Sequence, residues 1–336
     1  MRVFDGHNDV LSRLLERDRP DAPAGFLAGD GEGHLDLPRA ARGGLAGGCF
    51  AVFTCSPDDA DYDTGAYFAP VDPGRALREA LAQVALLLRL EQASAGRLRV
   101  ARSAADLDGD GLAAVLHLEG AEPIGPALDE LAVLHAAGLR SLGLVWSRPN
   151  AFATGVPFGF PGSPDQGPGL TEAGAALVRA CAELGVLVDV SHLNARGFWE
   201  VAELDAGPLV ASHSGAHALC PSPRNLTDDQ LRAIGERRGL VGINFHVGFL
   251  RADGALDTDT PLATVAAHAA HVAELAGAEC VALGSDFDGA AMPDGLADVT
   301  GLPALLDALR EAGFTEPDLE GIAWRNWRRV LAAAWG

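Results

Sequence analysis

Short apolar runs alternate with longer helical patterns along this chain, and that alternation limits its folds more than any other feature. Eight runs are predicted as strands, at residues 2–6, 48–54, 113–118, 141–145, 186–190, 208–211, 240–244 and 280–284. Helices are predicted between them, at residues 75–93, 127–137, 171–184, 195–204, 227–237, 261–276 and 302–312. Thr171-Glu172 is typical of a helix start, and Gly185 of a helix end. Eight such units predict a (β/α)8 TIM barrel.

The domain organisation predicted from the sequence is simple. The 336 residues, 48% of them hydrophobic, can build one large core, and there is no internal repeat or linker, so we expect a single domain over residues 1–336. An open doubly wound sheet is the alternative fold, but no G-x-G-x-x-G loop follows the first strand. Two Gly- and Pro-rich segments interrupt the alternation. We expect residues 19–47 to form a long loop and residues 148–169 to cover the barrel mouth.

Charge and cysteine usage exclude several classes of partner. A net charge of −21 argues against binding of nucleic acid, which requires a basic surface. The five cysteines are scattered without a C-x-x-C pair, as expected for free thiols in a reducing compartment. The N-terminus lacks a signal-peptide pattern, and no apolar stretch is long enough to span a bilayer. We therefore expect a soluble cytoplasmic protein with no membrane partner.

Potential metal ligands follow several predicted strands at the same relative place. They are His7 and Asp9 after the first strand, Glu119 after the third, His192 after the fifth, His213 after the sixth and Asp286 after the eighth. In a barrel these strand ends converge on the face that carries active sites. Three imidazoles and two carboxylates can hold two divalent cations if one carboxylate bridges them. Such a set suits zinc, with manganese or cobalt as substitutes, and predicts hydrolase chemistry.

Other histidines do not share this setting. His117 precedes Glu119 by two residues and is expected to fill the barrel interior, while His246 follows the seventh strand and could line the mouth. His268 and His271 lie three residues apart on a predicted helix, where we expect solvated side chains.

Six motifs closely resemble those of the membrane (renal) dipeptidase family of zinc peptidases. They are Asp5-Gly6-His7-Asn8-Asp9, His117-Leu118-Glu119-Gly120, Asp189-Val190-Ser191-His192, Ser212-His213-Ser214, Pro223-Arg224-Asn225 and Gly284-Ser285-Asp286-Phe287-Asp288-Gly289. The resemblance runs in order from Asp5 to Asn326. It implies an amidohydrolase-type barrel with two zinc ions that cleaves dipeptides, some with a D-residue at the C-terminal position. It also allows a homodimer.

The resemblance implies a role for each matching residue. His7 and Asp9 would bind one zinc ion, His192 and His213 the other, and Glu119 would bridge both. A hydroxide bridging the metals would attack the peptide carbonyl. Asp286 would take a proton from the bridging water and pass it to the leaving amine. Arg224 would pair with the terminal carboxylate of the substrate.

One position departs from the family pattern. Where the mammalian enzymes carry a histidine that contacts the substrate and stabilises the oxyanion, this chain carries Trp146. Trp146, Arg148 or Asn150 could replace the missing donor, so Trp146 and Asn150 are predicted to contact the substrate. The departure keeps an alternative open: a related amidohydrolase acting on an N-acyl amino acid, a lactam or a biosynthetic intermediate. A catalytically silent barrel used for binding is a third hypothesis.

Overall fold

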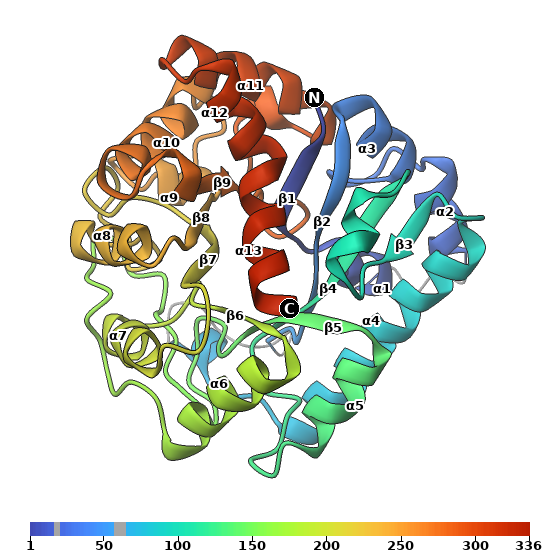
Figure 1. Cartoon of the computed structure of the whole chain (residues 1–336), viewed down its shortest axis with the longest axis vertical. Helices are drawn as coiled ribbons and strands as arrows, with labels where there is room; N and C mark the ends of the chain where they lie inside the picture. The colour runs from blue at the N-terminus through green and yellow to red at the C-terminus, as the bar shows by residue number, and fades with distance from the viewer. Residues whose placement is uncertain (17–20, 57–64) are drawn as a thin grey trace.

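The computed structural model describes residues 1–16, 21–56 and 65–336, and a closed barrel of parallel strands lies at its centre (Figure 1). The strands are β1 (Val3–Asn8), β2 (Leu45–Phe53), β3 (Leu98–Val100), β4 (Leu112–Glu119), β5 (Leu139–Gly143), β6 (Leu187–Asp189), β7 (Val210–Ser214), β8 (Leu240–Ile243) and β9 (Val281–Leu283). Eight of them close the ring in the order β2-β1-β9-β8-β7-β6-β5-β4, with β4 paired to β2 from Gly47↔Ala113 to Phe53↔Glu119. The predicted TIM barrel is confirmed.

The ninth strand, β3, was not predicted from the sequence. It pairs in parallel with the first residues of β4, from Leu98↔Leu112 to Val100↔Ala114, and lies outside the ring. With three residues it is too short to show the alternation on which strand prediction depends.

Helices surround the barrel, and each predicted helix is present within a few residues (Figure 1). They are α1 (Val10–Glu16), α2 (Ala22–Ala28), α3 (Leu37–Gly43), α4 (Pro73–Ala93), α5 (Asp129–Ala137), α6 (Glu172–Leu184), α7 (Ala195–Leu204), α8 (Asp228–Glu236), α9 (Val247–Leu250), α10 (Leu262–Ala276), α11 (Leu302–Glu311), α12 (Glu316–Glu320) and α13 (Asn326–Trp335). Short 3-10 turns connect several of them, and a π-helical turn, η6 (Gly321–Arg325), leads into α13.

The two segments predicted as loops differ in the structure. Residues 148–169 contain no helix and no named strand, as expected. The prediction for 19–47 was wrong over its described part, because it contains α2 and α3. Both helices have seven residues and begin with proline at one of their first two positions, and Asp36 caps α3 by accepting from Arg39 N at 2.8 Å. Residues 19 and 20 lie outside the described residues.

Helix α13 closes the end of the barrel opposite the strand C-termini. Figure 1 shows it crossing in front of the strands, and its Trp327, Val330 and Leu331 pack in one buried cluster with Phe4 and other residues near the strand starts. The Trp327 indole N–H donates to Leu283 O at 2.9 Å. Because this end is filled with apolar side chains, only the other end of the barrel can admit a ligand.

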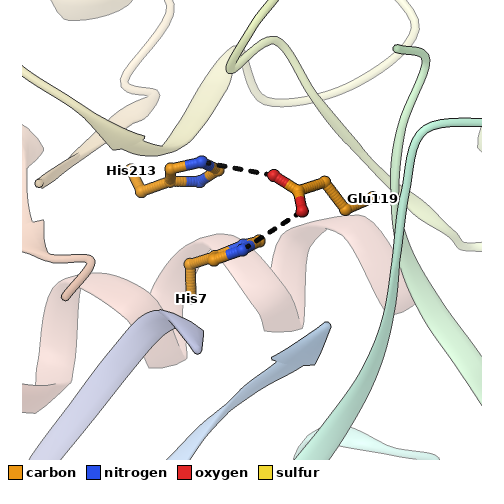
Figure 2. Close-up of side chains that lie close together, drawn as sticks. All are labelled: His7, Glu119 and His213. Carbon is orange, nitrogen blue, oxygen red and sulfur yellow. Dashed lines mark ion pairs between the residues drawn. The ribbon is translucent and has the colours of Figure 1, made fainter. Parts of the chain in front are cut away.

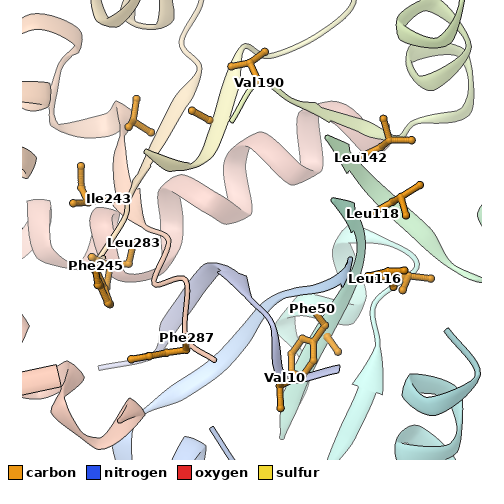
Figure 3. Packing of buried hydrophobic residues seen from close by; sticks show 14 of the residues in the cluster. Val10, Phe50, Leu116, Leu118, Leu142, Val190, Ile243, Phe245, Leu283 and Phe287 are labelled. Carbon is orange, nitrogen blue, oxygen red and sulfur yellow. The ribbon is translucent and has the colours of Figure 1, made fainter. Parts of the chain in front are cut away.

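The main hydrophobic core lies between the strands and the surrounding helices. Figure 3 shows side chains such as Leu116, Leu118 and Leu142 around the barrel, and all three are buried. Successive residues of a strand face opposite sides, so the outward direction of Leu116 and Leu118 turns His117 and Glu119 toward the barrel axis. This alternation delivers polar side chains to the interior.

Among the described residues, no helix has the length and apolar character that crossing a membrane requires.

Candidate metal centre

The polar residues at the strand ends meet at the open end of the barrel. His7 lies in β1, Glu119 ends β4, and His213 lies in β7. Asp9, His192 and Asp286 follow the ends of β1, β6 and β9 within three residues. His192 and Asp286 have φ values of 65°, a backbone conformation that non-glycine residues adopt at a cost and that is common at functional sites.

Glu119 lies between the three histidines, and its two carboxylate oxygens face different partners. Oε1 is 3.0 Å from His192 Nε2 and 3.5 Å from His213 Nε2. Oε2 is 3.6 Å from His7 Nε2, which is itself 3.4 Å from Asp9 Oδ2. Figure 2 shows the carboxylate with one oxygen toward His213 and the other toward His7. The residues thus divide into two donor groups that share Glu119.

The donor set fits divalent cations. His7, Glu119 and His213 place ligand atoms within 4.8 Å of one another, as do His7, Asp9 and Asp286. Neither ring nitrogen of the fully buried His7 has a hydrogen-bond partner among the described residues. Buried polar atoms are almost always satisfied, so an imidazole left open between carboxylates is typical of a metal ligand.

Electrostatics at His192, His213 and Glu119 support the same interpretation, whereas at His7 burial is outweighed by Glu119 and Asp9, which raise its pKa well above the ordinary value. Burial lowers the pKa of His192 to about 4, assisted by the nearby Arg224 charge, and burial also lowers the pKa of His213 well below its ordinary value. Both rings are therefore neutral at pH 7, the form that binds metals. Burial opposes ionisation of Glu119, but the neighbouring His7 and His192 hold its pKa well below the usual range, so it is a carboxylate.

Asp286 faces the same space next to His7 and Asp9. Its Oδ2 accepts from Asn244 Nδ2 at 2.9 Å, and its backbone N–H donates to His7 O at 3.0 Å. Asn244 directly follows β8 and is buried. Sequence reasoning missed Asn244, although its place at a strand end is the signal that identified the other residues.

A cavity of about 400 Å³ opens above these residues. Asp9, Glu119, His192 and Asp286 line its polar part. Five aromatic side chains also line it, and we call them the aromatic wall: Phe53, Tyr67, Trp146, Phe158 and Phe249. The Trp146 ring centroid lies 5.8 Å from that of His192, so this wall directly adjoins a candidate ligand.

Arg224 is buried near the candidate ligands and, like Asn150, is not among the residues that line the cavity. Its Nη2 donates to His213 O at 3.1 Å, and its guanidinium carbon is 5.4 Å from the Phe249 ring centroid. Burial lowers its pKa to about 10, which leaves it charged at pH 7. Its Nε has no hydrogen-bond partner in the described part of the chain, which is unusual for a buried cation.

Asn150 lies elsewhere than expected. It does not line this cavity; its Nδ2 donates to Leu144 O at 2.8 Å, and its Oδ1 accepts from Phe152 N at 2.9 Å and Ala153 N at 3.2 Å. These three hydrogen bonds hold the backbone turn that follows β5. The arrangement therefore does not favour the predicted substrate contact.

Four of the histidines that are not candidate ligands have different surroundings. His117 is buried in the barrel interior, with Nδ1 2.9 Å from Ser141 Oγ, and His246 lines the cavity, as expected of each. The expectation for His268 was wrong: it is fully buried, accepts from Ala216 N at 3.0 Å and lies 3.0 Å from Leu250 O. His271 is partly buried, 2.9 Å from Asp228 Oδ1.

A (β/α)8 barrel that gathers histidines and carboxylates at its strand ends defines a metal-dependent hydrolase. Residues 1–335 match the family described as membrane dipeptidase, peptidase family M19. The chain belongs to this family and is a metal-dependent dipeptidase.

Several relatives resemble the chain over most of its length. An uncharacterized protein of the pqqA 5′ region in Klebsiella pneumoniae is 50% identical over 257 residues, covering 75% of this chain and 95% of the relative. A solved metallopeptidase from Rhodobacter sphaeroides, liganded with a phosphinate mimic of the dipeptide L-Ala-D-Ala, is 47% identical and has a TM-score of 0.94, covering 100% of this chain and 99% of its own. A solved M19 metallopeptidase named dipeptidase AC is 48% identical, with a TM-score of 0.93 and the same coverage.

Proposed function

We propose that this chain is a dizinc dipeptidase that hydrolyses dipeptides, including those with a D-residue at the C-terminal position. The observation that carries the proposal is the division of donors around Glu119, whose Oε1 faces His192 and His213 and whose Oε2 faces His7. A carboxylate placed in this way is suited to bridge two cations. The relative that binds an L-Ala-D-Ala mimic supports a substrate of this kind.

The protein's own residues would hold the cations. His7 and Asp9 would bind one zinc ion, His192 and His213 the other, and Glu119 both. When bound, the pair would lower the pKa of a water molecule and polarise the scissile carbonyl. Nitrogen and oxygen donors without thiolate also accept manganese or cobalt.

Asp286 would move the proton. It lies at the cavity beside His7 and Asp9, and Asn244 holds one of its oxygens from behind. A carboxylate fixed in this orientation can take a proton from the attacking water and return it to the leaving amine, as general base and then general acid. No other carboxylate at the cavity combines these contacts, since Asp288 is paired with Arg13 at 2.9 Å.

The cavity also suggests how the substrate binds. Arg224 does not line the cavity, but it lies beside Phe249, which does. It is buried and charged with an unused Nε donor, which suits the terminal carboxylate of a dipeptide. The aromatic wall, with Trp146 beside His192, would contact an apolar part of the substrate. We propose that Trp146 limits the size of the substrate side chain that lies against it.

Trp146 also favours the second candidate, a related amidohydrolase that acts on another small amide such as an N-acyl amino acid or a lactam. The family histidine that it replaces would have contacted the substrate of a dipeptidase.

One experiment separates the candidates: elemental analysis of the purified protein, with hydrolysis of a panel of L,L and L,D dipeptides and N-acyl amino acids on the same sample. About two zinc ions per chain with dipeptide cleavage supports the proposal. Two ions with cleavage of the other amides alone favours the second candidate, and a protein that binds no metal contradicts both.

A further inference from the structure

Two of the candidate zinc ligands have a serine hydroxyl behind the imidazole ring. Ser212 Oγ lies 2.8 Å from His213 Nδ1, and Ser147 Oγ lies 2.7 Å from His192 Nδ1. All four residues are buried, so bulk water does not compete for these contacts. In each ring, Nε2 faces Glu119 and Nδ1 faces the hydroxyl.

The contact at His213 continues to a buried carboxylate. Ser212 Oγ donates to Asp189 Oδ2 in a short hydrogen bond, and Asp189 Oδ1 accepts from Ser191 N at 3.0 Å and Ser212 N at 2.8 Å. Asp189 ends β6 and Ser212 lies in β7, so the contact joins neighbouring strands. The described residues provide no carboxylate partner for Ser147, so His192 has the hydroxyl alone.

The direction of these hydrogen bonds follows from metal binding. An imidazole that gives the lone pair of Nε2 to a cation must carry its proton on Nδ1. His213 Nδ1–H then donates to Ser212 Oγ, and the Ser212 hydroxyl is left to donate to Asp189. The His213 ring, the Ser212 hydroxyl and the Asp189 carboxylate thus each have the hydrogen-bond partner that their chemistry requires. The negative charge of Asp189 lies at the end of these contacts that is farthest from the cation.

The backbone around Ser212 leaves little freedom to rearrange. Three glycines surround its carbonyl oxygen, and a Cβ placed on them would lie 2.3 Å (Gly6), 1.9 Å (Gly242) and 2.0 Å (Gly284) from Ser212 O. These distances are far below van der Waals contact, so Ser212 occupies space that only glycine neighbours allow. The glycines thus fix the Ser212 backbone, and the contacts with Asp189 Oδ2 and His213 Nδ1 place its hydroxyl.

We propose that Asp189 and Ser212 form a positioning pair, which fixes the tautomer and orientation of His213 and strengthens zinc binding at that ligand. The inference rests on the proposed function, because it requires His213 to bind a cation through Nε2. Outer partners of metal-binding histidines typically contribute about tenfold to a hundredfold in metal affinity. The charge behind Ser212 makes this pair stronger than the lone hydroxyl of Ser147.

The test measures zinc affinity by competition with a chromogenic chelator, with zinc ion itself as the probe. Ser212→Ala and Asp189→Asn should each weaken zinc binding about tenfold to a hundredfold, and Ser147→Ala should weaken it less. In Asp189→Asn, the amide nitrogen can donate to Ser212 Oγ, which removes the acceptor for the serine proton. A matched control is Ser141→Ala, because Ser141 is a buried serine whose Oγ lies 2.9 Å from Nδ1 of His117, a histidine that is not a candidate ligand.

The outcomes are distinct. Weaker zinc binding in Ser212→Ala but not in Ser141→Ala, with equal melting temperatures of the two metal-free proteins, supports the pair. Equal zinc affinity in these two variants overturns it. His213→Ala separates this inference from the proposed function: if that variant keeps both zinc ions at wild-type affinity, His213 is not a ligand and the proposed site is wrong as well. If His213→Ala loses zinc while Ser212→Ala does not, only the positioning pair is wrong.

Discussion

The role of Arg224 can be tested by a change that removes its charge but keeps its apolar length. In Arg224→Met, the side chain still packs near Phe249, but the buried guanidinium and its free Nε donor are gone. A hydrogen bond to a charged partner contributes about 1.5–3 kcal/mol, which corresponds to about tenfold to 150-fold in kcat/KM. We expect a loss in this range for a dipeptide, mostly through KM, because the terminal carboxylate is remote from the bond that breaks.

The assay must separate this role from a structural one, since Arg224 also donates to the carbonyl of His213. We therefore compare a dipeptide with the same dipeptide amidated at its C-terminus, on wild type and Arg224→Met. The amide lacks the charge that Arg224 would bind, so the substitution should reduce its hydrolysis much less. Arg224→Lys keeps a positive charge without the planar fork and should fall between the two. An equal loss on both substrates would refute the assigned contact and leave Arg224 as a support for His213.

Two further changes test other parts of the site, and a third tests a buried histidine outside it. Asp286→Asn should keep its metal content by elemental analysis but lose about a hundredfold to ten-thousandfold in kcat, and retained turnover would remove Asp286 from the mechanism. Glu119→Gln should lose zinc, and a variant that still holds two tightly bound ions would contradict bridging. Burial lowers the pKa of His268 to about 4, from an ordinary value of 6.5. As the pH falls below 6.5, the unfolded chain takes up the proton before the folded protein does. The free energy of unfolding therefore decreases, by about 2 kcal/mol near pH 5. His268→Gln, which has no titrating ring, should lose less between pH 7 and pH 5 in urea unfolding, and equal losses would show that His268 is not responsible.

The sequence predicted the barrel and the meeting of its strand-end residues for a definite physical reason. Short apolar runs between helical patterns indicate strands, and the parallel strands of a barrel end on one face. A residue at a strand end, such as His213 or Glu119, therefore points to that face. The short helices α2 and α3 could not be predicted in the same way. Their Gly- and Pro-rich composition is typical of loops, and the Asp36 cap becomes recognisable only when the helix it begins is known.

Contacts between distant segments were beyond prediction. Ser212 and Ser147 are ordinary serines in sequence, and their positions behind two histidines depend on strand register and on the turn after β5. Asn150 is the opposite case. It was predicted to contact the substrate, but its side chain forms hydrogen bonds with the backbone of its own turn. His268 lies on a helix whose face toward α8 and β8 is buried, and its Nδ1 accepts from the backbone N of Ala216.

The pairing of β1 with β9, where Asp5 lies opposite Leu283, has a consequence for how the protein is made. A chain emerging from the ribosome cannot close its barrel until nearly all of its residues are available, and β1 must wait through most of synthesis for one of its two neighbours. His7 is then separated from Glu119 and His213 by long stretches of unfolded chain. On the proposed function, metal capture would belong to the last stage of folding, and the cations would stabilise the finished protein without guiding its early steps.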